Sequence, residues 1–252
     1  MRRYRRHKYN LTSLIISIIF VLGAGQFFAG NHSKDVIQHN DTKTNVAVQK
    51  DEQINVNTLN DIPDFNNIPY VRLNNNIPEF TDEEKKVESL EEYGEHDSLN
   101  RCTACIALVG KETMPTSPRG SIGMVKPTGW HTIKYTGIDG KFLYNRCHLI
   151  GYQLTGENAN TKNLITGTRY LNVEGMLPFE NRVADYVNAT KNHVLYRVTP
   201  IFKGNDLVAR GVKMEAYSVE DNGKGVSFNV FCYNAQPGIE IDYSNGDSKP
   251  IE

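Results

Sequence analysis

The residues best suited to chemistry lie between positions 145 and 180. The tetrad Asn-Arg-Cys-His at 145–148 is followed by Asn163, Asn172 and Glu180, and these last three are separated by nine and eight residues. A neutral imidazole takes a proton from water, an amide oxygen holds a hard metal ion, and a guanidinium faces phosphate. The set is therefore suited to phosphodiester hydrolysis with one metal ion.

These residues require a strand, a loop and a helix to bring them together. The sequence predicts strands at 131–135 and 141–144, with a turn at 137–140 between them. A helix is expected to begin near Pro178, since proline suits a first helical turn. Phe179, Val183 and Val187 then recur at helical spacing, which places Glu180 near the start of an amphipathic helix.

The remaining elements predict an α+β fold with a central antiparallel sheet and helices packed on it. Thr81 and Glu84 form a capping-box pattern, so a helix is expected from there to about Glu92. The apolar run Cys105–Val109 indicates a buried strand. Further strands are expected at 70–73, 193–202, 207–210, 212–219 and 226–233.

The first sixty residues are unlike the rest of the chain. Four arginines and a lysine precede an uncharged, mostly apolar segment from Leu11 to Ala29. This pattern is typical of a signal peptide or a single N-terminal membrane anchor, and both place the following chain outside the cell. Residues 31–60 read as a disordered stalk because they are polar and poor in large apolar side chains. The folded domain is expected over 61–245, with a tail at 246–252.

The charge balance limits the kinds of nucleic-acid contact that are expected. The chain has a formal net charge of -1, and without the five basic residues of its start it has 23 Lys and Arg against 29 Asp and Glu. This balance argues against a broad basic surface that holds duplex by counterion release. Any contact with nucleic acid has to be local and assisted by a metal.

Four cysteines leave several arrangements open. Cys102, Cys105, Cys147 and Cys232 allow three disulfide pairings, among which the sequence does not choose. The Cys102-x-x-Cys105 spacing resembles half of a zinc site, but no second pair and no suitably spaced histidine accompany it. Structural cysteines, free or disulfide-bonded, are the favoured interpretation.

A family resemblance rests on these same residues. A strand, an [Asp]-Arg-Gly-His-like tetrad, a loop and a helix with an asparagine are similar to the DNA/RNA non-specific endonucleases, which are ββα-metal or His-Me finger nucleases. Exported bacterial members, of the DNA-entry and streptococcal secreted type, are the most similar. The resemblance covers roughly residues 65–245 and is densest from Tyr144 to Tyr186.

The resemblance implies a role for each matching residue. His148 corresponds to the general base, Asn172 to the ligand of Mg²⁺ (with Mn²⁺ as a substitute), and Glu180 to a carboxylate near the water shell of the metal. Asn163 corresponds to an asparagine near the phosphate. Arg119 loosely resembles an upstream arginine of the family. As further candidate contacts to phosphate, the sequence offers Arg169 and Arg182.

Two positions depart from the family pattern. Asn145 stands where the family usually has aspartate, which removes a negative charge but leaves an amide that can orient the waters of the metal. Cys147 stands in place of glycine, and on a strand its side chain should point away from that of His148. There it either belongs to the core or pairs with Cys232. Arg146 either contacts phosphate or fixes the strand.

The sequence therefore predicts an exported, metal-dependent endonuclease that cuts DNA and RNA with little sequence preference. It would act through the phosphate backbone, and the resemblance implies products with 5′-phosphate ends. The N-terminal segment would contact a membrane if uncleaved, and no obligate protein partner is implied. One alternative is a nuclease-like surface module that binds DNA with weak or no catalysis, which Asn145 and the acidic balance motivate. Another is a surface adhesion domain.

Overall fold

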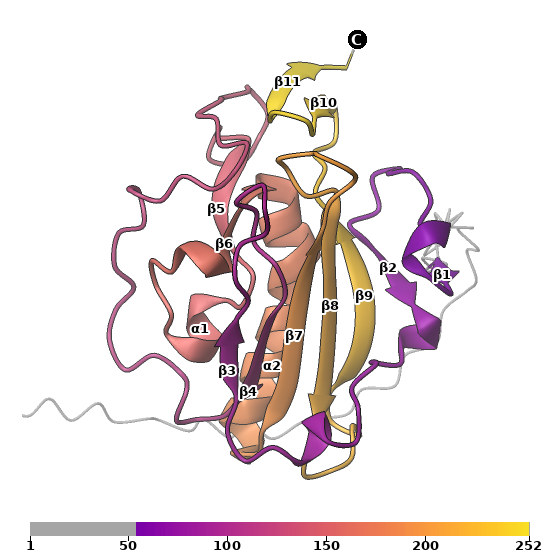
Figure 1. Ribbon diagram of the computed structural model, residues 1–252, viewed down its shortest axis with the longest axis vertical. Helices are drawn as coiled ribbons and strands as arrows, with labels where there is room; N and C mark the ends of the chain where they lie inside the picture. The colour runs from indigo at the N-terminus through magenta and orange to yellow at the C-terminus, as the bar shows by residue number, and fades with distance from the viewer. Residues whose placement is uncertain (1–53, 252) are drawn as a thin grey trace, which may run out of the picture. The chain divides into compact units, whose positions relative to one another are not determined.

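A seven-stranded sheet forms the centre of the protein (Figure 1). The structure is a computed structural model and describes residues 54–251. Neighbouring strands are antiparallel except for the parallel pair at one edge. In spatial order the strands are β1 (Asn55–Val56), β2 (Tyr70–Leu73), β9 (Ser227–Tyr233), β8 (Gly211–Ser218), β7 (Val194–Ile201), β4 (Cys105–Val109) and β3 (Glu91–Tyr93).

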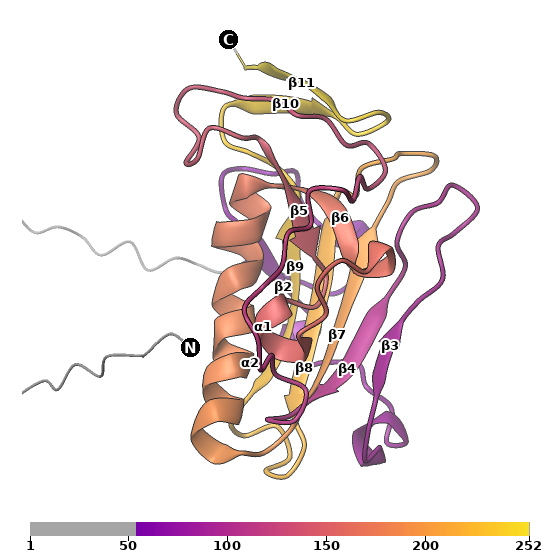
Figure 2. The same cartoon turned by 90° about the vertical axis from the view of Figure 1, so that its left-hand side faces the viewer.

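One long helix covers a face of this sheet. Helix α2 (Leu177–Thr190) has Pro178 in its first turn and ends at Lys191, which has a left-handed φ of 65°. Its apolar side chains Val183 and Val187 are fully buried and belong to the same cluster as Tyr196 and Phe228 of the sheet. Figure 2 shows α2 along one side of the central strands. This packing fixes the orientation of the first turn of α2, where Glu180 lies.

A separate hairpin lies beside the start of α2 (Figure 2). It consists of β5 (Tyr144–His148) and β6 (Leu164–Thr168), paired antiparallel. The short helix α1 (Tyr152–Thr155) and a 3-10 turn at Thr161–Asn163 lie between its strands in sequence, and a π-helix, Leu171–Met176, joins β6 to α2. The order strand, strand, helix is the ββα arrangement that the sequence predicted.

The segment after Phe80 differs from the sequence prediction. The reciprocal bonds of the capping box do form, from Thr81 N to Glu84 Oε2 (2.7 Å) and from Glu84 N to Thr81 Oγ1 (3.1 Å). They close only one 3-10 turn, Glu84–Lys86, and the chain then extends into the edge strand β3. The predicted helix to Glu92 is wrong, because Val87 and Leu90 pack on the apolar cluster of Phe80, Leu108 and Leu195 instead.

The observed bounds of the other predicted strands range from full agreement with the prediction to absence of the strand. The bounds of β2 and β4 agree with the predictions, and β7, β8 and β9 differ by one or two residues. No strand forms at 207–210, where the chain turns. The strands expected at 131–135 and 141–144 are reduced to a single bridge between Lys134 and Phe142, and the strand of this region is β5.

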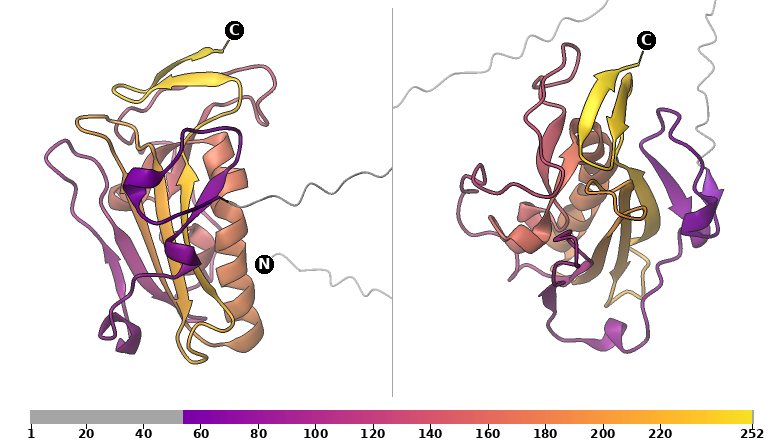
Figure 3. Two further views of the ribbon diagram at one scale, coloured as in Figure 1. Left: turned by 90° about the vertical axis from the view of Figure 1, so that its right-hand side faces the viewer. Right: turned by 45° about the horizontal axis from the view of Figure 1, so that its top comes forward.

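Short strands form on both sides of the expected domain bounds at 61 and 245. Residues 55–56, which the sequence analysis put in the stalk, pair with Arg72 and Leu73. At the other end, β10 (Ile239–Asp242) pairs with β11 (Asp247–Pro250), and this hairpin lies over the loop that contains Trp130 and Ile138 (Figure 3).

The predicted signal or anchor and residues 31–53 of the stalk lie outside the described residues. Within 54–251, no helix is both long and apolar enough to cross a membrane.

Candidate active site

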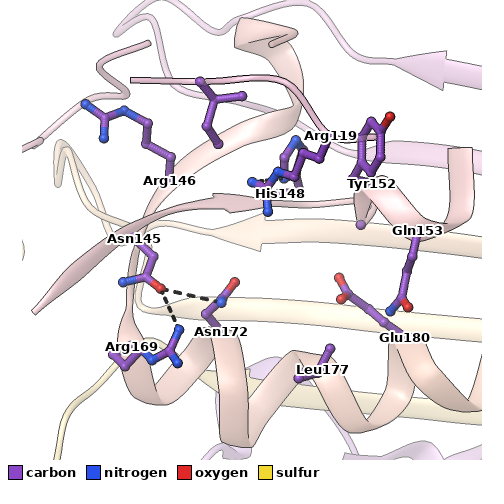
Figure 4. Close-up of a pocket in the computed structure, with 12 residues that line it drawn as sticks. Arg119, Asn145, Arg146, His148, Tyr152, Gln153, Arg169, Asn172, Leu177 and Glu180 are labelled. Carbon is purple, nitrogen blue, oxygen red and sulfur yellow. Dashed lines mark hydrogen bonds between the residues drawn. The ribbon is translucent and has the colours of Figure 1, made fainter. Parts of the chain in front are cut away.

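Six of the residues predicted to do chemistry line one cavity of about 510 Å³ (Figure 4): Arg119, Asn145, Arg146, His148, Asn172 and Glu180. The cavity lies between β5, the start of α2 and the loop before β5. Its walls contain three arginines and one acidic residue, so it is cationic within an acidic domain. They are formed by Arg119, Ile122, Asn145, Arg146, His148, Gly151, Tyr152, Gln153, Arg169, Asn172, Leu177 and Glu180.

Strand alternation divides the tetrad between two faces of β5. Cys147 has no exposed surface, and its thiol lies 3.6 Å from Met176 Sδ beneath the π-helix. His148 lies on the opposite face and is 6% exposed. The prediction that Cys147 points away from His148 into the core is confirmed. All four cysteines are free thiols, so the alternative pairing with Cys232 does not form.

Both ring nitrogens of His148 have a neighbour. Nε2 lies 2.8 Å from the backbone carbonyl oxygen of Asn158. Because a carbonyl oxygen only accepts, Nε2 carries the hydrogen, and in the neutral ring Nδ1 keeps its lone pair. Arg119 Nη2 lies 3.2 Å from Nδ1 and donates to it. The carbonyl thus selects the tautomer in which Nδ1 is the basic atom.

The environment keeps this imidazole neutral. Burial lowers the pKa of His148 to about 4, and the positive charge of Arg119 adds to this effect. The hydrogen bond to Asn158 raises the pKa and only partly compensates. At neutral pH the ring is therefore fully available to accept a proton.

Asn172 presents its amide to the same cavity from the π-helix. Its Oδ1 accepts from the thiol of Cys147 at 3.0 Å, and its Nδ2 lies 3.5 Å from Asn145 Oδ1. These two contacts define which side of the amide is oxygen. In Figure 4, Asn145, Asn172 and His148 lie around one space.

Glu180 closes another wall of the cavity. Its carboxyl group packs against Gly151, where an added Cβ would come within 2.9 Å of it. Burial raises the pKa of Glu180 to about 7, although Arg119 and a hydrogen bond from Gln153 act in the opposite direction. The carboxylate forms no ion pair within 4.0 Å with any described residue, so a nearby cation would relieve its desolvation.

The donor set fits a hard divalent cation that keeps most of its waters. In residues 54–251, no three His, Cys, Asp or Glu side chains form a metal-binding group. The cavity offers amide oxygens from Asn172 and Asn145 and the desolvated carboxylate of Glu180. Mg²⁺ binds oxygen ligands and gives up its waters reluctantly, so a site with few protein ligands suits it.

Arg146 has a structural role on the side of β5 that carries His148. Its Nε donates to the carbonyl oxygen of Val125, its Nη2 donates to that of Gly123 at 2.8 Å, and its guanidinium lies 4.0 Å from the Trp130 ring. Of the two roles open from the sequence, the fixing of local structure accounts for these contacts. Arg146 ties the loop before β5 to the strand.

Arg169 lies on the opposite side of the cavity. Its Nη2 donates to Asp139 at 2.6 Å, and its Nη1 lies 3.4 Å from Asn145 Oδ1. It therefore reaches the position at which the family usually has aspartate, and its charge is largely matched by Asp139.

Two residues predicted to contact the substrate, Asn163 and Arg182, do not line this cavity. Asn163 is fully buried, and its amide bonds both backbone groups of Ile150: Oδ1 accepts from the N–H at 2.8 Å and Nδ2 donates to the carbonyl at 2.9 Å. Burial keeps this amide away from the cavity, and its two bonds hold the chain that follows His148. Arg182 does not line the cavity and lies 5.9 Å from the Phe228 ring.

The sequence analysis did not identify several residues that shape the site. Gly151 leaves room for Glu180, and Gly167 leaves room for Cys147, since a Cβ on Gly167 would approach that of Cys147 to 2.6 Å. Asn158 contacts His148 through its backbone carbonyl, so the identity of its side chain does not indicate this role.

Comparisons with known proteins agree with this arrangement. Residues 81–220 match the family model described as DNA/RNA non-specific endonuclease, a range that contains every residue of the cavity. A deoxyribonuclease of Streptococcus dysgalactiae subsp. equisimilis is 32% identical over 111 residues, which is 41% of this chain. The match spans only 32% of the length of that relative.

Two solved structures share the fold. The crystal structure of NucA from Streptococcus agalactiae with magnesium ion bound is 26% identical, with a TM-score of 0.64 over 71% of this chain and 86% of that one. The structure of Sda1 nuclease with bound zinc ion is 27% identical, with a TM-score of 0.53 over 62% and 79% of the two chains.

Proposed function

The chain belongs to the DNA/RNA non-specific endonuclease family, and from that premise we propose that it hydrolyses phosphodiester bonds of DNA, and of RNA, with little sequence preference. His148 is the general base, Asn172 holds Mg²⁺, and Glu180 and Asn145 position the waters of the metal. Mn²⁺ substitutes for Mg²⁺. Since the magnesium-bound and zinc-bound relatives differ in the ion, the choice of metal is part of this proposal.

One observation carries the proposal. The carbonyl of Asn158 takes the Nε2 hydrogen of His148, and the unprotonated Nδ1 faces the cavity into which Asn172 also extends. A base and a neutral oxygen ligand at one cavity are the two groups that one-metal phosphodiester hydrolysis requires. A structural histidine would also donate to a carbonyl, but it would not need to line a cavity that an amide side chain shares.

Arg119 couples substrate binding to the base. In the free protein its guanidinium occupies the Nδ1 lone pair of His148 at 3.2 Å. Phosphate is a stronger acceptor for a guanidinium than an imidazole nitrogen, because the bond is then charge-assisted at both ends. The scissile phosphate therefore draws Arg119 away, and Nδ1 becomes free to take the proton of the attacking water.

The other polar groups prepare the site for this step. A bound divalent cation would neutralise charge on the phosphate and stabilise the leaving 3′ oxygen. Asn172 supplies its amide oxygen, which the Cys147 thiol orients. Because all of these groups address the sugar-phosphate backbone, little base preference results. Proton removal from water by a positioned base contributes on the order of 10² to 10⁴ in rate.

Export is part of the proposal and rests on residues 1–30. Basic residues followed by an apolar segment predict that the catalytic domain acts outside the cell, either secreted or anchored. The free thiols of Cys102, Cys105, Cys147 and Cys232 are all buried, so they are shielded from oxidants there.

Asn145 supports a second candidate function. It places an amide where the family has a carboxylate, next to the cationic Arg169. A nuclease-like module that binds DNA without cutting it would retain the cationic cavity and dispense with strong metal binding.

Plasmid cleavage distinguishes the two functions. The full chain should convert supercoiled plasmid to open and linear forms in Mg²⁺ or Mn²⁺, and chelator or His148→Ala should abolish this. His131→Ala is the matched control, since that histidine does not line the cavity, and it should cut at the wild-type rate. DNA retention in a shift assay without cutting in either metal would establish the binding module. Unchanged cleavage by the His148 variant would remove the site assignment.

A further inference from the structure

A second cavity of about 560 Å³ lies next to the proposed active site. Its walls come from the loop before β5, the segment between α1 and β6, and the loop before β4. Its volume lies within the range of small-ligand pockets and is similar to that of the first cavity. Neither the base nor the proposed metal ligand lines it.

The two cavities share their dividing wall. Val125 lines the second cavity, while its carbonyl oxygen accepts a hydrogen bond from Arg146, which lines the first. Likewise Ala159 lines the second cavity, and the carbonyl of the preceding residue, Asn158, fixes His148. The backbone at Val125 and at Asn158–Ala159 therefore lies between the two cavities, which are neighbours, so nucleotides on one strand could occupy both.

The side chains that line the second cavity would not repel a phosphate. No aspartate or glutamate lines it, whereas the cavity beside β10 and β11 is lined by three acidic residues and the one beside β1 by Glu79. Of the acidic residues close to its walls in sequence, Glu95 pairs with Lys162 and Asp97 with Arg101 at 2.7 Å, and Glu157 does not line the cavity.

Lys126 provides the free cation of this wall. It is exposed and makes no ion pair with any residue in 54–251. Two residues earlier, Met124 is 70% exposed, which is unusual for a large apolar side chain. A flexible thioether suits contact with the faces of different bases.

We propose that this second cavity binds a nucleotide that flanks the scissile phosphate, with Lys126 on its phosphate and Met124 against its base. The inference rests on the proposed function and extends it to the length of substrate. A cation and an apolar side chain on one groove bind single strands without reading their sequence. Two neighbouring cavities that both carry a cation thus select a chain of several nucleotides over a lone diester.

The test compares two substrates with one set of full-chain variants. The substrates are a deoxyoctanucleotide and bis(4-nitrophenyl) phosphate, which has a single diester and no flanking nucleotide. Lys126→Ala should lower kcat/KM on the octanucleotide about 3- to 10-fold, mainly through KM, and leave the small diester within about twofold. The slope of log KM against log salt concentration should fall by about one. Lys224→Ala, an exposed lysine on the β8–β9 turn, is the matched control and should change neither.

Ala159→Trp tests the cavity independently of charge. This exposed residue lines the second cavity, so the indole should fill it and reduce cleavage of the octanucleotide but not of the small diester. Equal losses on both substrates, or no loss with Lys126→Ala and Ala159→Trp, would overturn the proposal. A wild-type protein that cuts neither substrate would instead overturn the proposed function.

Discussion

Replacing Glu180 with glutamine should remove an acidic limb from the pH profile of cleavage at low magnesium concentration. Burial raises the pKa of this carboxyl to about 7, and in the proposed mechanism its ionised form orients the waters of the metal. The wild-type kcat/KM should then rise as pH increases through 7. One unit below the pKa only about a tenth of the carboxyl groups are ionised, so activity at pH 6 should be about a tenth of the plateau.

Magnesium should move this limb in a predictable direction. A cation next to Glu180 favours the ionised form, so a higher Mg²⁺ concentration should shift the limb to lower pH. His148, with a pKa of about 4, contributes its own limb only well below this range. The plateau itself should fall with Glu180→Gln, because the amide cannot replace the negative charge.

The assay is initial-rate cleavage of a fluorescent oligonucleotide from pH 5 to 8.5 at two Mg²⁺ concentrations. Glu180→Gln should give a profile that is flat from pH 6 to 8 at both. A variant that keeps the limb near pH 7 would refute the assignment, as would a wild-type limb that does not respond to Mg²⁺. Asp185→Asn, on an exposed turn of α2, controls for the loss of one negative charge and should keep the wild-type profile.

Three further predictions follow from the contacts of the site. Metal-free wild-type protein should lose stability as pH rises from about 4.5 to 7, because the folded state binds the Glu180 proton more tightly than the unfolded state, and Glu180→Gln should remove this loss in thermal melts. Asn163→Ala should lower the free energy of unfolding by about 1–3 kcal/mol, measured in urea, since it leaves both backbone groups of Ile150 without partners; an unchanged midpoint contradicts its structural role. Cys147→Ala should weaken Mn²⁺ binding to the substrate-free protein, measured by calorimetry, because Asn172 loses the thiol that orients its oxygen. Cys105→Ala is the control and should not change Mn²⁺ binding, since the Cys105 thiol is remote from Asn172.

The sequence correctly predicted the helices and strands that are signalled by their own residues. The apolar run Cys105–Val109 could only be a buried strand, and Pro178 placed the start of α2 to within one residue. The capping box at Thr81 is also a local pattern, but it was overridden by burial of Val87 and Leu90 against the sheet. Strand β6 was missed because its interior Gly167 and two threonines give no apolar period, and its stability comes from pairing with β5.

The same distinction holds for the site. His148, Asn172 and Glu180 were recognised by type and spacing, and they do line one cavity. The contact of Arg119 with His148 joins positions 29 residues apart, and the carbonyl of Asn158 has no side-chain identity, so neither could be read from the chain. Asn163 had the expected spacing, yet burial directed its amide to the backbone of Ile150.

Chemical rescue of His148→Gly tests the base assignment most directly. The substitution leaves a space that opens onto the cavity, and added imidazole can enter it and replace the missing ring. Plasmid cleavage in Mg²⁺ should be nearly absent without imidazole and should rise with imidazole concentration to saturation, in proportion to its neutral form. Cleavage by His148→Gly at the wild-type rate, or residual cleavage that imidazole does not change, would contradict the account.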